Sequence, residues 1–179
     1  MYLGERDLKQ YGYRAVYEVP IQGGRSVFMS VSPTQYMEHR SVVIVDTERF
    51  LALWRACPYP LHKEIAHGSP DTWEKDYKYE DAKDGFSAGE MNPVPLARIN
   101  FSTAYLSLFP RIPILNRLSR YIEFVSFTNG ITRTIWLFCQ GAPYFPVEVN
   151  TEDAEGLAHA AGVSGSTPVS VACLFTNNR

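Results

Sequence analysis

The stretch from Ser126 to Val149, SFTNGITRTIWLFCQGAPYFPVEV, constrains the fold more than any other part of the chain. An apolar strand pattern ends at Asn129-Gly130, where the glycine allows a positive φ, and an apolar helix pattern begins directly afterwards. A second strand pattern starts at Tyr144. The stretch therefore predicts strand, tight turn, helix and strand in succession, an order typical of a sheet covered by helices.

The rest of the chain continues this alternation. Strand patterns cover 13–19, 25–31, 41–46, 93–102, 123–128 and 168–175, and helix patterns cover 47–56, 114–122, 131–140 and 151–162. Gly23-Gly24 supplies a hairpin turn, and Asp46 is the expected N-cap of the helix that follows it. A further helix is predicted to start at Ser69-Pro70 and to fray through 81–85, within a polar segment that we interpret as an exposed insertion.

Length and composition favour one α+β domain with a mixed sheet over residues 1–179, since 179 residues with 45% hydrophobic content are enough for one core. We expect 1–90 to hold the hairpin, a helix and the acidic insertion, and 91–179 to hold the main core, to which Ile135, Trp136 and Phe138 contribute. A net charge of -2 argues against a nucleic-acid binder that is basic throughout.

The cysteines and the apolar runs bear on the environment of the protein. Cys57, Cys139 and Cys173 are widely spaced in apolar runs, which predicts buried, reduced thiols rather than disulfides or a zinc site. The N-terminal sequence MYLGERDLKQ does not resemble a targeting signal, and no apolar run is long enough to span a membrane. We therefore expect a cytoplasmic protein without membrane insertion.

The Asn-Gly turn and the helix start predict a phosphate-binding site. Backbone N–H groups in the first turn of a helix favour an anion, and Arg133 adds a forked, permanently charged donor that must face solvent or that anion. The predicted phosphate-binding or nucleotide-binding residues are Asn129, Gly130, Thr132, Arg133 and Thr134. In the alternative interpretation, Thr132 caps the helix and Arg133 pairs with a surface carboxylate such as Glu148 or Glu152.

Charge distribution suggests further candidates. No acid occurs between Met91 and Ile122, and the four arginines there are predicted to contact nucleic-acid backbone: Arg98, Arg111, Arg117 and Arg120. A solvated face without function is the alternative. Metal-assisted phosphodiester chemistry uses carboxylates, so Glu90 and Glu123 are the candidate catalytic residues beside Arg133, although each can also be an exposed carboxylate. The sequence identifies no set of metal ligands.

Three pieces of the chain, YRAVYEVP, DGFSAGEMNPVPLA and FTNGITRTIWL, resemble the plasmid fertility inhibition factor family. The order of strand, G-x-x-R, apolar helix, Gly-Ala and Pro-Val strand also resembles the ParB/sulfiredoxin superfamily. The matching residues are Asn129, Gly130, Thr132, Arg133, Gly141, Pro146 and Val147. Ile131 stands where sulfiredoxins have cysteine, so thiol repair is not expected.

This resemblance implies a ParB/sulfiredoxin-like fold and a bacterial protein that blocks conjugative or T-DNA transfer. It further implies a DNase with ATPase activity that uses ATP and Mg²⁺. The implied partners are DNA, as the relaxase-bound transfer strand or plasmid DNA, and the coupling protein of a type IV secretion system, to which the protein would be recruited at the inner membrane. A non-catalytic protein that binds the coupling protein or the relaxosome is the second hypothesis.

Overall fold

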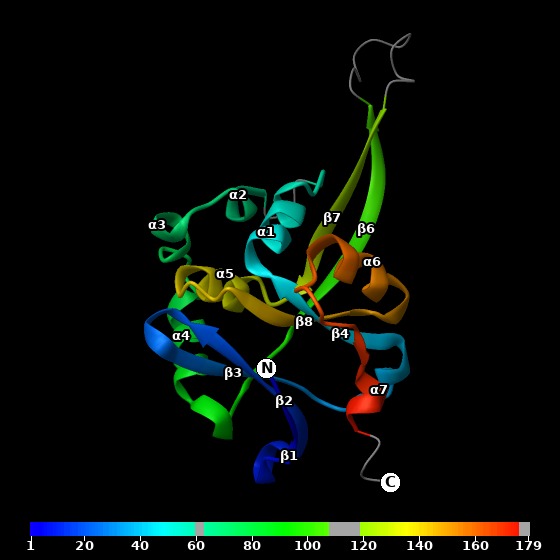
Figure 1. Cartoon of the computed structure of the whole chain (residues 1–179). Coiled ribbons are helices and arrows are strands. Elements are labelled where there is room, and N and C mark those ends of the chain that lie inside the picture. The colour runs from blue at the N-terminus through cyan, green and yellow to red at the C-terminus, as the bar shows by residue number, and fades with distance from the viewer. Residues whose placement is uncertain (60–62, 108–118, 176–179) are drawn as a thin grey trace.

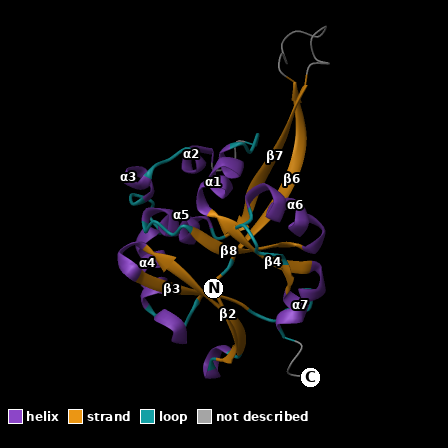
Figure 2. Cartoon of the chain, in the orientation of Figure 1, coloured by secondary structure: helices purple, strands orange, loops and turns teal. Residues whose placement is uncertain are grey.

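The computed structural model describes residues 1–59, 63–107 and 119–175, which fold around two mixed β-sheets with helices packed on them (Figures 1 and 2). One continuous hydrophobic core includes buried residues from Ala15 to Phe175. The prediction of a single α+β domain with a mixed sheet is therefore confirmed, while the ParB/sulfiredoxin likeness stays a prediction.

The first sheet is built mainly by the N-terminal strands. In spatial order it consists of β1 (Tyr2–Asp7), β2 (Tyr13–Ile21), β3 (Arg25–Val31) and β5 (Val94–Pro95). The predicted hairpin joins β2 to β3, and Gly23 and Gly24 in its turn have φ values of 77° and 70°. The short strand β5 pairs with β3 in parallel, which makes the sheet mixed.

The second sheet lies at the centre of the molecule. In spatial order it consists of β7 (Ser119–Asn129), β6 (Ala97–Ser107), β8 (Tyr144–Asn150), β4 (Arg40–Asp46) and β9 (Val169–Ser170). Among the described strand pairs of this second sheet, only β6 and β8 are parallel. Because β4 joins this sheet and β5 joins the first, both sheets combine strands from 1–90 and 91–179.

Seven α-helices lie in the described part of the chain. They are α1 (Thr47–Arg55), α2 (Lys63–Ala66), α3 (Pro70–Trp73), α4 (Tyr79–Ser87), α5 (Ile131–Cys139), α6 (Thr151–Ala161) and α7 (Val171–Leu174). Short 3-10 turns occupy Lys9–Tyr11, Gln22–Gly24, Met37–His39 and Gly89–Met91. Asp46 caps α1 as predicted, since its Oδ1 accepts the Arg49 N–H at 3.0 Å.

The polar segment before residue 90 differs from the prediction in two ways. The single helix expected from Ser69-Pro70 is divided into α3 and α4, and the residues expected to fray lie inside α4. It is also not an exposed insertion, because Trp73, Tyr79 and Phe86 are buried. The Phe86 ring stacks on Trp136 of α5 with centroids 4.4 Å apart, so aromatic packing outweighs the polar composition.

Two other predictions are wrong in part. Residues 119–122 of the predicted helix 114–122 belong to β7, where Tyr121 pairs with Tyr105 across the ladder, while 114–118 lie outside the described residues. The predicted strand 168–175 is extended only at β9 and then turns into α7. Val171 and Leu174 are both buried, a spacing of three that suits one helical turn better than a strand.

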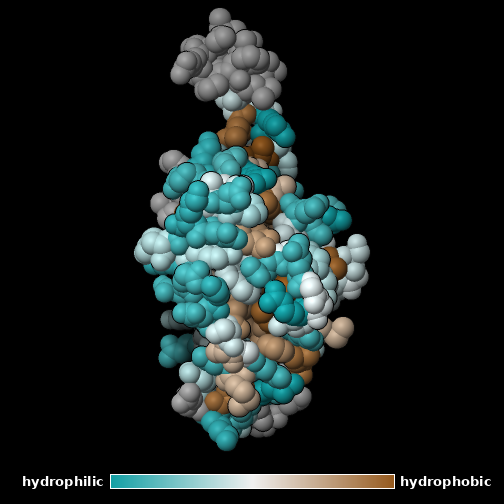
Figure 3. Space-filling view, turned by 90° about the vertical axis from the view of Figure 1, so that its left-hand side faces the viewer, coloured by the Kyte–Doolittle hydropathy of each residue, from teal (hydrophilic) through white to brown (hydrophobic). Residues whose placement is uncertain are grey.

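Strands β6 and β7 extend beyond the body of the molecule as a two-stranded ribbon (Figure 1). We call residues 103–107 and 119–123 the arm. Tyr105, Leu106 and Tyr121 of the arm are exposed, and the two tyrosine rings lie 5.4 Å apart. Figure 3 shows hydrophobic side chains among hydrophilic ones on the arm, and further hydrophobic side chains low on the same face. The arm therefore offers apolar contact area away from the core.

The three cysteines are less buried than predicted. Cys57 and Cys139 are half-buried, and Cys173 is exposed. The prediction of buried thiols is therefore wrong for Cys173, because its place in α7 turns it away from the side that buries Val171 and Leu174.

Candidate functional site

The turn that enters α5 is fixed by a glycine. Gly130 has φ 99°, and a Cβ at this position would lie 2.8 Å from both the Cα and the Cβ of Ala97 in β6. A positive φ and this close approach each require glycine. The Asn-Gly turn is thus present as predicted, and it brings the start of α5 directly against β6.

The inner side of α5 anchors this turn to the core. Ile135, Trp136 and Leu137 are buried and Phe138 packs against the core, which confirms the predicted core positions. Thr134 is fully buried, and its hydroxyl donates to the Gly130 carbonyl at 3.0 Å. Thr134 is therefore wrongly predicted as a phosphate ligand, because its hydroxyl is used inside the helix start.

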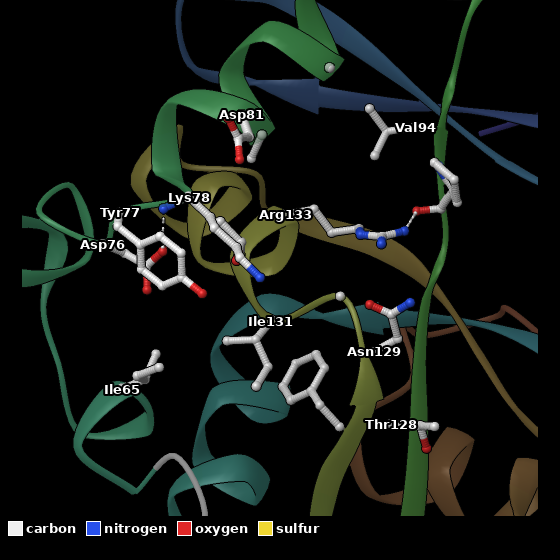
Figure 4. Close-up of a pocket in the computed structure, with 16 residues that line it drawn as sticks. Ile65, Asp76, Tyr77, Lys78, Asp81, Val94, Thr128, Asn129, Ile131 and Arg133 are labelled. Carbon is white, nitrogen blue, oxygen red and sulfur yellow. Dashed lines mark hydrogen bonds between the residues drawn. The ribbon is translucent and has the colours of Figure 1, made fainter.

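A cavity of about 580 Å³ opens at the start of α5, and we call it the α5 cavity (Figure 4). One wall contains four of the predicted phosphate-binding residues: Asn129, Gly130, Thr132 and Arg133. The opposite wall is formed by Tyr77, Lys78 and their neighbours before and within α4. The structure thus brings most of the predicted set together and adds a wall that sequence reasoning missed.

Arg133 does not point freely outward. Its Nη1 donates to the carbonyls of Pro95 and Leu96, at 2.5 and 3.2 Å. The expectation that this side chain must face solvent or an anion is therefore incomplete, because neutral carbonyls also satisfy a half-buried guanidinium. The alternative pairing with Glu148 is wrong as well, since that carboxylate binds Arg40 and Arg98.

The remaining edge of Arg133 faces the cavity. Its Nε and Nη2 donate to no acceptor within the described residues. Burial and the nearby positive charge of Arg98 lower the pKa of Arg133. An anion at this edge would offset both effects. The second wall adds the Lys78 ammonium, whose hydrogen bond to the Tyr77 side chain raises the pKa of Lys78.

Carboxylates are also present at the cavity, though not the predicted ones. Asp76 and Asp81 line the wall that faces Arg133, and Asp76 Oδ1 accepts the Lys78 N–H at 2.9 Å. The described residues contain no group of three or more His, Cys, Asp or Glu that could hold a metal by itself. A Mg²⁺ ion here would need phosphate oxygens as further ligands, which is the usual arrangement for that ion.

Neither predicted catalytic glutamate lines the α5 cavity. Glu90 lies in the 3-10 turn Gly89–Met91 and pairs with Arg6, Oε1 to Nη1, at 2.6 Å. Glu123 lies inside β7 rather than at its start, opposite Thr103, and six residues before Asn129. Six extended residues span about 20 Å, so Glu123 is too far from the Asn-Gly turn to act there.

Two of the four predicted nucleic-acid arginines are described, and they lie apart. Arg98 lies in β6 next to Asn129 of β7, Arg120 is exposed on the arm, and Arg111 and Arg117 lie outside the described residues. Of the two described arginines, Arg98 is the one close to the α5 cavity. Among the helices of the described part of the chain, none has the length and apolar character needed to cross a membrane.

Comparisons with known proteins agree with this architecture. The family model described as plasmid fertility inhibition factor matches residues 42–162. The protein osa of Shigella flexneri is 27% identical over 161 residues, which cover 89% of this chain and 74% of that protein. A solved structure described as Oncogenic Suppression Activity Protein, a plasmid fertility inhibition factor, in its gold(I) cyanide derivative, superposes with a TM-score of 0.71 at 26% identity, covering 90% of this chain and 75% of that one. The matched model spans β4 to α6 and includes the whole turn into α5, so this chain belongs to the plasmid fertility inhibition factor family.

Proposed function

We propose that this fertility inhibition factor blocks conjugative or T-DNA transfer by binding DNA of the transfer system and cleaving it, with binding and hydrolysis of ATP. The DNA is the relaxase-bound transfer strand or plasmid DNA. The observation that supports this proposal is the cavity-facing edge of Arg133, which lies beside the Gly130 turn and across from Lys78.

The phosphate group is bound by donors whose positions are already fixed. The first turn of α5 and Arg133 both line the α5 cavity, and the carbonyls of Pro95 and Leu96 hold that guanidinium in place. A guanidinium edge can bind two phosphate oxygens at once. Because the donors are held before the ligand arrives, little ordering accompanies binding.

The α5 cavity also fits the nucleotide and the metal that the family resemblance implies. Its volume of about 580 Å³ is within the range of small-molecule sites. Asp76 and Asp81 are the carboxylates that would hold Mg²⁺ against phosphate oxygens bound near Arg133. When bound, Mg²⁺ would neutralise part of the phosphate charge and polarise the phosphate oxygens. Lys78 and Arg133 orient the phosphate between the two walls.

The test measures ATP hydrolysis and the cleavage of single- and double-stranded DNA by highly purified protein with Mg²⁺. Arg133→Ala and Asp81→Asn are expected to lower both activities at least tenfold, since a charge-assisted contact contributes about 1.5–3 kcal/mol. Arg25→Ala, an exposed arginine in the first sheet, is the matched control. Activity that is equal in wild type and Arg133→Ala would come from a contaminating nuclease and would contradict the proposal.

The arm favours a second candidate function. Exposed Tyr105, Leu106 and Tyr121 suit contact with another protein, such as the coupling protein or the relaxosome, without catalysis. In this case Tyr105→Ser with Tyr121→Ser abolishes inhibition of transfer in cells, while Arg133→Ala preserves it. Either function places the protein in the cytoplasm, recruited to the inner-membrane transfer apparatus, and cell fractionation with the transfer system present and absent tests that location.

A further inference from the structure

A second cavity, which we call the Arg40 cavity, lies where β6, β8 and β4 are neighbours in the central sheet. Its volume is about 370 Å³. Its lining includes Tyr36, His39, Arg40, Arg98, Glu148 and Asn150. These residues come from three separate segments, which is why the sequence pattern pointed to Arg98 alone among them as a binding residue.

The strand register places the charged residues of this cavity in one row. Arg98 pairs with Glu148 across β6 and β8, and Arg40 pairs with Asn150 across β8 and β4. Cross-strand partners project to the same face of a sheet, and so do residues two apart along a strand. The row therefore runs from Arg98 through Glu148 and Asn150 to Arg40.

Glu148 holds both arginines in a fixed orientation. Its side chain is only 5% exposed, and its Oε1 accepts Arg40 Nε at 2.9 Å while its Oε2 accepts Arg98 Nε at 3.1 Å. Arg40 Nη1 also donates to Asn150 Oδ1 at 2.8 Å. Within the described residues, both Nη groups of Arg98 and the Nη2 of Arg40 have no hydrogen-bond acceptor.

The charges of the row do not cancel. Two guanidinium groups face one carboxylate, which leaves a positive charge in a cavity whose lining also includes Tyr36 and His39. The free guanidinium N–H groups are donors without acceptors among the described residues. Donors and net positive charge together select an anion with several oxygens, such as a phosphate group.

The row continues into the α5 cavity through Arg98. Arg98 pairs with Asn129 in the ladder of β6 and β7, and Asn129 lines the α5 cavity. The two positive charges of Arg98 and Arg133 are close enough that the first lowers the pKa of the second, after the larger effect of burial. A negatively charged chain lying over both cavities would relieve this repulsion.

We propose that the Arg40 cavity is a second phosphate site, in which Glu148 positions Arg98 and Arg40, and that it binds the backbone of the same nucleic-acid strand whose neighbouring phosphate occupies the α5 cavity. The span favours a strand over a single anion. Asn129, Arg98, Glu148 and Arg40 lie on four adjacent strands, so the row covers three strand spacings, about 15 Å. This inference rests on the proposed binding of DNA at the α5 cavity.

The experiment measures the affinity of the full chain for a short, fluorescently labelled single-stranded oligonucleotide and, separately, for ATP with Mg²⁺, over a range of salt concentrations. Arg40→Gln is expected to weaken oligonucleotide binding about tenfold and to reduce the magnitude of the slope of log K against log salt by about 0.7, the effect of one lost phosphate contact on a single strand. ATP affinity is expected to stay within about twofold of wild type. Arg25→Gln is the matched control, which changes the net charge equally at an exposed position of the other sheet.

A second experiment tests whether Glu148 positions the two arginines. This role and simple charge attraction predict opposite changes of oligonucleotide affinity in Glu148→Gln. Glu148→Gln removes a negative charge, so attraction alone would tighten oligonucleotide binding. If Glu148 orients the two arginines, binding weakens instead, and the loss becomes smaller when Arg40→Gln is already present, because only Arg98 is then left to be oriented. Melting curves of each variant establish that the compared proteins are folded, and Arg40→Gln alone still tests the site if Glu148→Gln does not fold.

The outcomes separate this inference from the proposed function. Oligonucleotide binding that depends on Arg133 but is unchanged in Arg40→Gln would overturn the second site and leave the α5 site standing. Binding that is unchanged in Arg133→Ala but weakened in Arg40→Gln would overturn the proposed function and the shared strand together. An equal loss of ATP and oligonucleotide affinity in Arg40→Gln would assign the cavity to the nucleotide and overturn the assignment to a strand.

Discussion

The α5 cavity and the Arg40 cavity present arginines in two different ways. In the first, Arg133 is held by the neutral carbonyls of Pro95 and Leu96, whereas in the second, Arg40 and Arg98 share the buried carboxylate of Glu148. The neutral carbonyls leave the full positive charge of Arg133, whereas the carboxylate of Glu148 offsets one of the two positive charges of Arg40 and Arg98. The first arrangement favours strong binding of one phosphate, and the second favours fixed geometry along a chain of phosphates.

From this contrast we expect a large loss of stability when Glu148 is replaced. Glu148→Gln leaves two partly buried arginines without their anion, and we expect a loss of about 2–4 kcal/mol, less than for a fully buried pair because Arg98 is 47% exposed. A loss of this size lowers the melting temperature by about 5–15 °C. Glu80→Gln, which breaks the exposed pair with Lys83, is the control and is expected to cost less than about 1 kcal/mol. Equal melting temperatures for both variants would contradict the stabilising role of Glu148 between the two arginines.

An effect of similar size is expected at the turn that holds the α5 cavity against β6. Gly130→Ala combines an unfavourable φ with a contact of 2.8 Å to Ala97, and we expect a loss of about 2–4 kcal/mol in the free energy of unfolding. Gly12→Ala is a matched control, because Gly12 has a φ of 67° but no other group lies within 4 Å of the point that its Cβ would occupy. Its expected cost is about 1–2 kcal/mol. Chemical denaturation gives the loss in the free energy of unfolding for each variant. The difference between the two losses is the contribution of the close approach to Ala97.

A smaller effect is expected on binding at Arg133. Arg133→Ala should weaken ATP and oligonucleotide binding about tenfold or more, and Arg133→Lys should recover only part of the loss, because an ammonium cannot bind two oxygens as a fork. Calorimetric titration of the three proteins measures this difference. Full recovery by lysine would show that charge alone, without the geometry fixed by the two carbonyls, accounts for the site.

The smallest effect is expected at the partly exposed pair of Arg6 and Glu90. Glu90→Gln should cost less than about 1 kcal/mol in stability, because both side chains are partly exposed, and it should leave ATP hydrolysis and DNA cleavage unchanged. The measurement is a melting curve together with both activity assays. Loss of either activity would contradict this expectation and support the catalytic role that the sequence predicted for Glu90.

Local features of the site were predictable from the sequence, and features that depend on packing were not. Asn129-Gly130 and the apolar spacing of Ile135 and Trp136 are read within one segment, so the turn and the buried side of α5 follow from the pattern. Lys78 reaches the cavity because Phe86 of the same segment stacks on α5, a contact between residues fifty positions apart. No periodicity within one segment encodes such a contact.

The errors in the fold have the same origin. Residues 119–122 are compatible with a helix or a strand, and pairing with β6 decides between them. The carbonyls that bind Arg133 belong to a segment almost forty residues earlier, so its orientation could not be derived from its own helix. The sequence therefore predicted one wall of the α5 cavity and, of the Arg40 cavity, Arg98 alone, while the other wall and the remaining residues were missed.

The arm has a consequence for solubility, because β7 is the outermost strand of the central sheet. A long edge strand can recruit the edge of another molecule and begin aggregation. Charged side chains of both signs, Arg120 and Glu123, stand along this edge, and a strand that added to it would have to remove them from water. By this argument Glu123, which lies too far from the Asn-Gly turn to act there, hinders the assembly of the tyrosine-bearing arm into larger sheets.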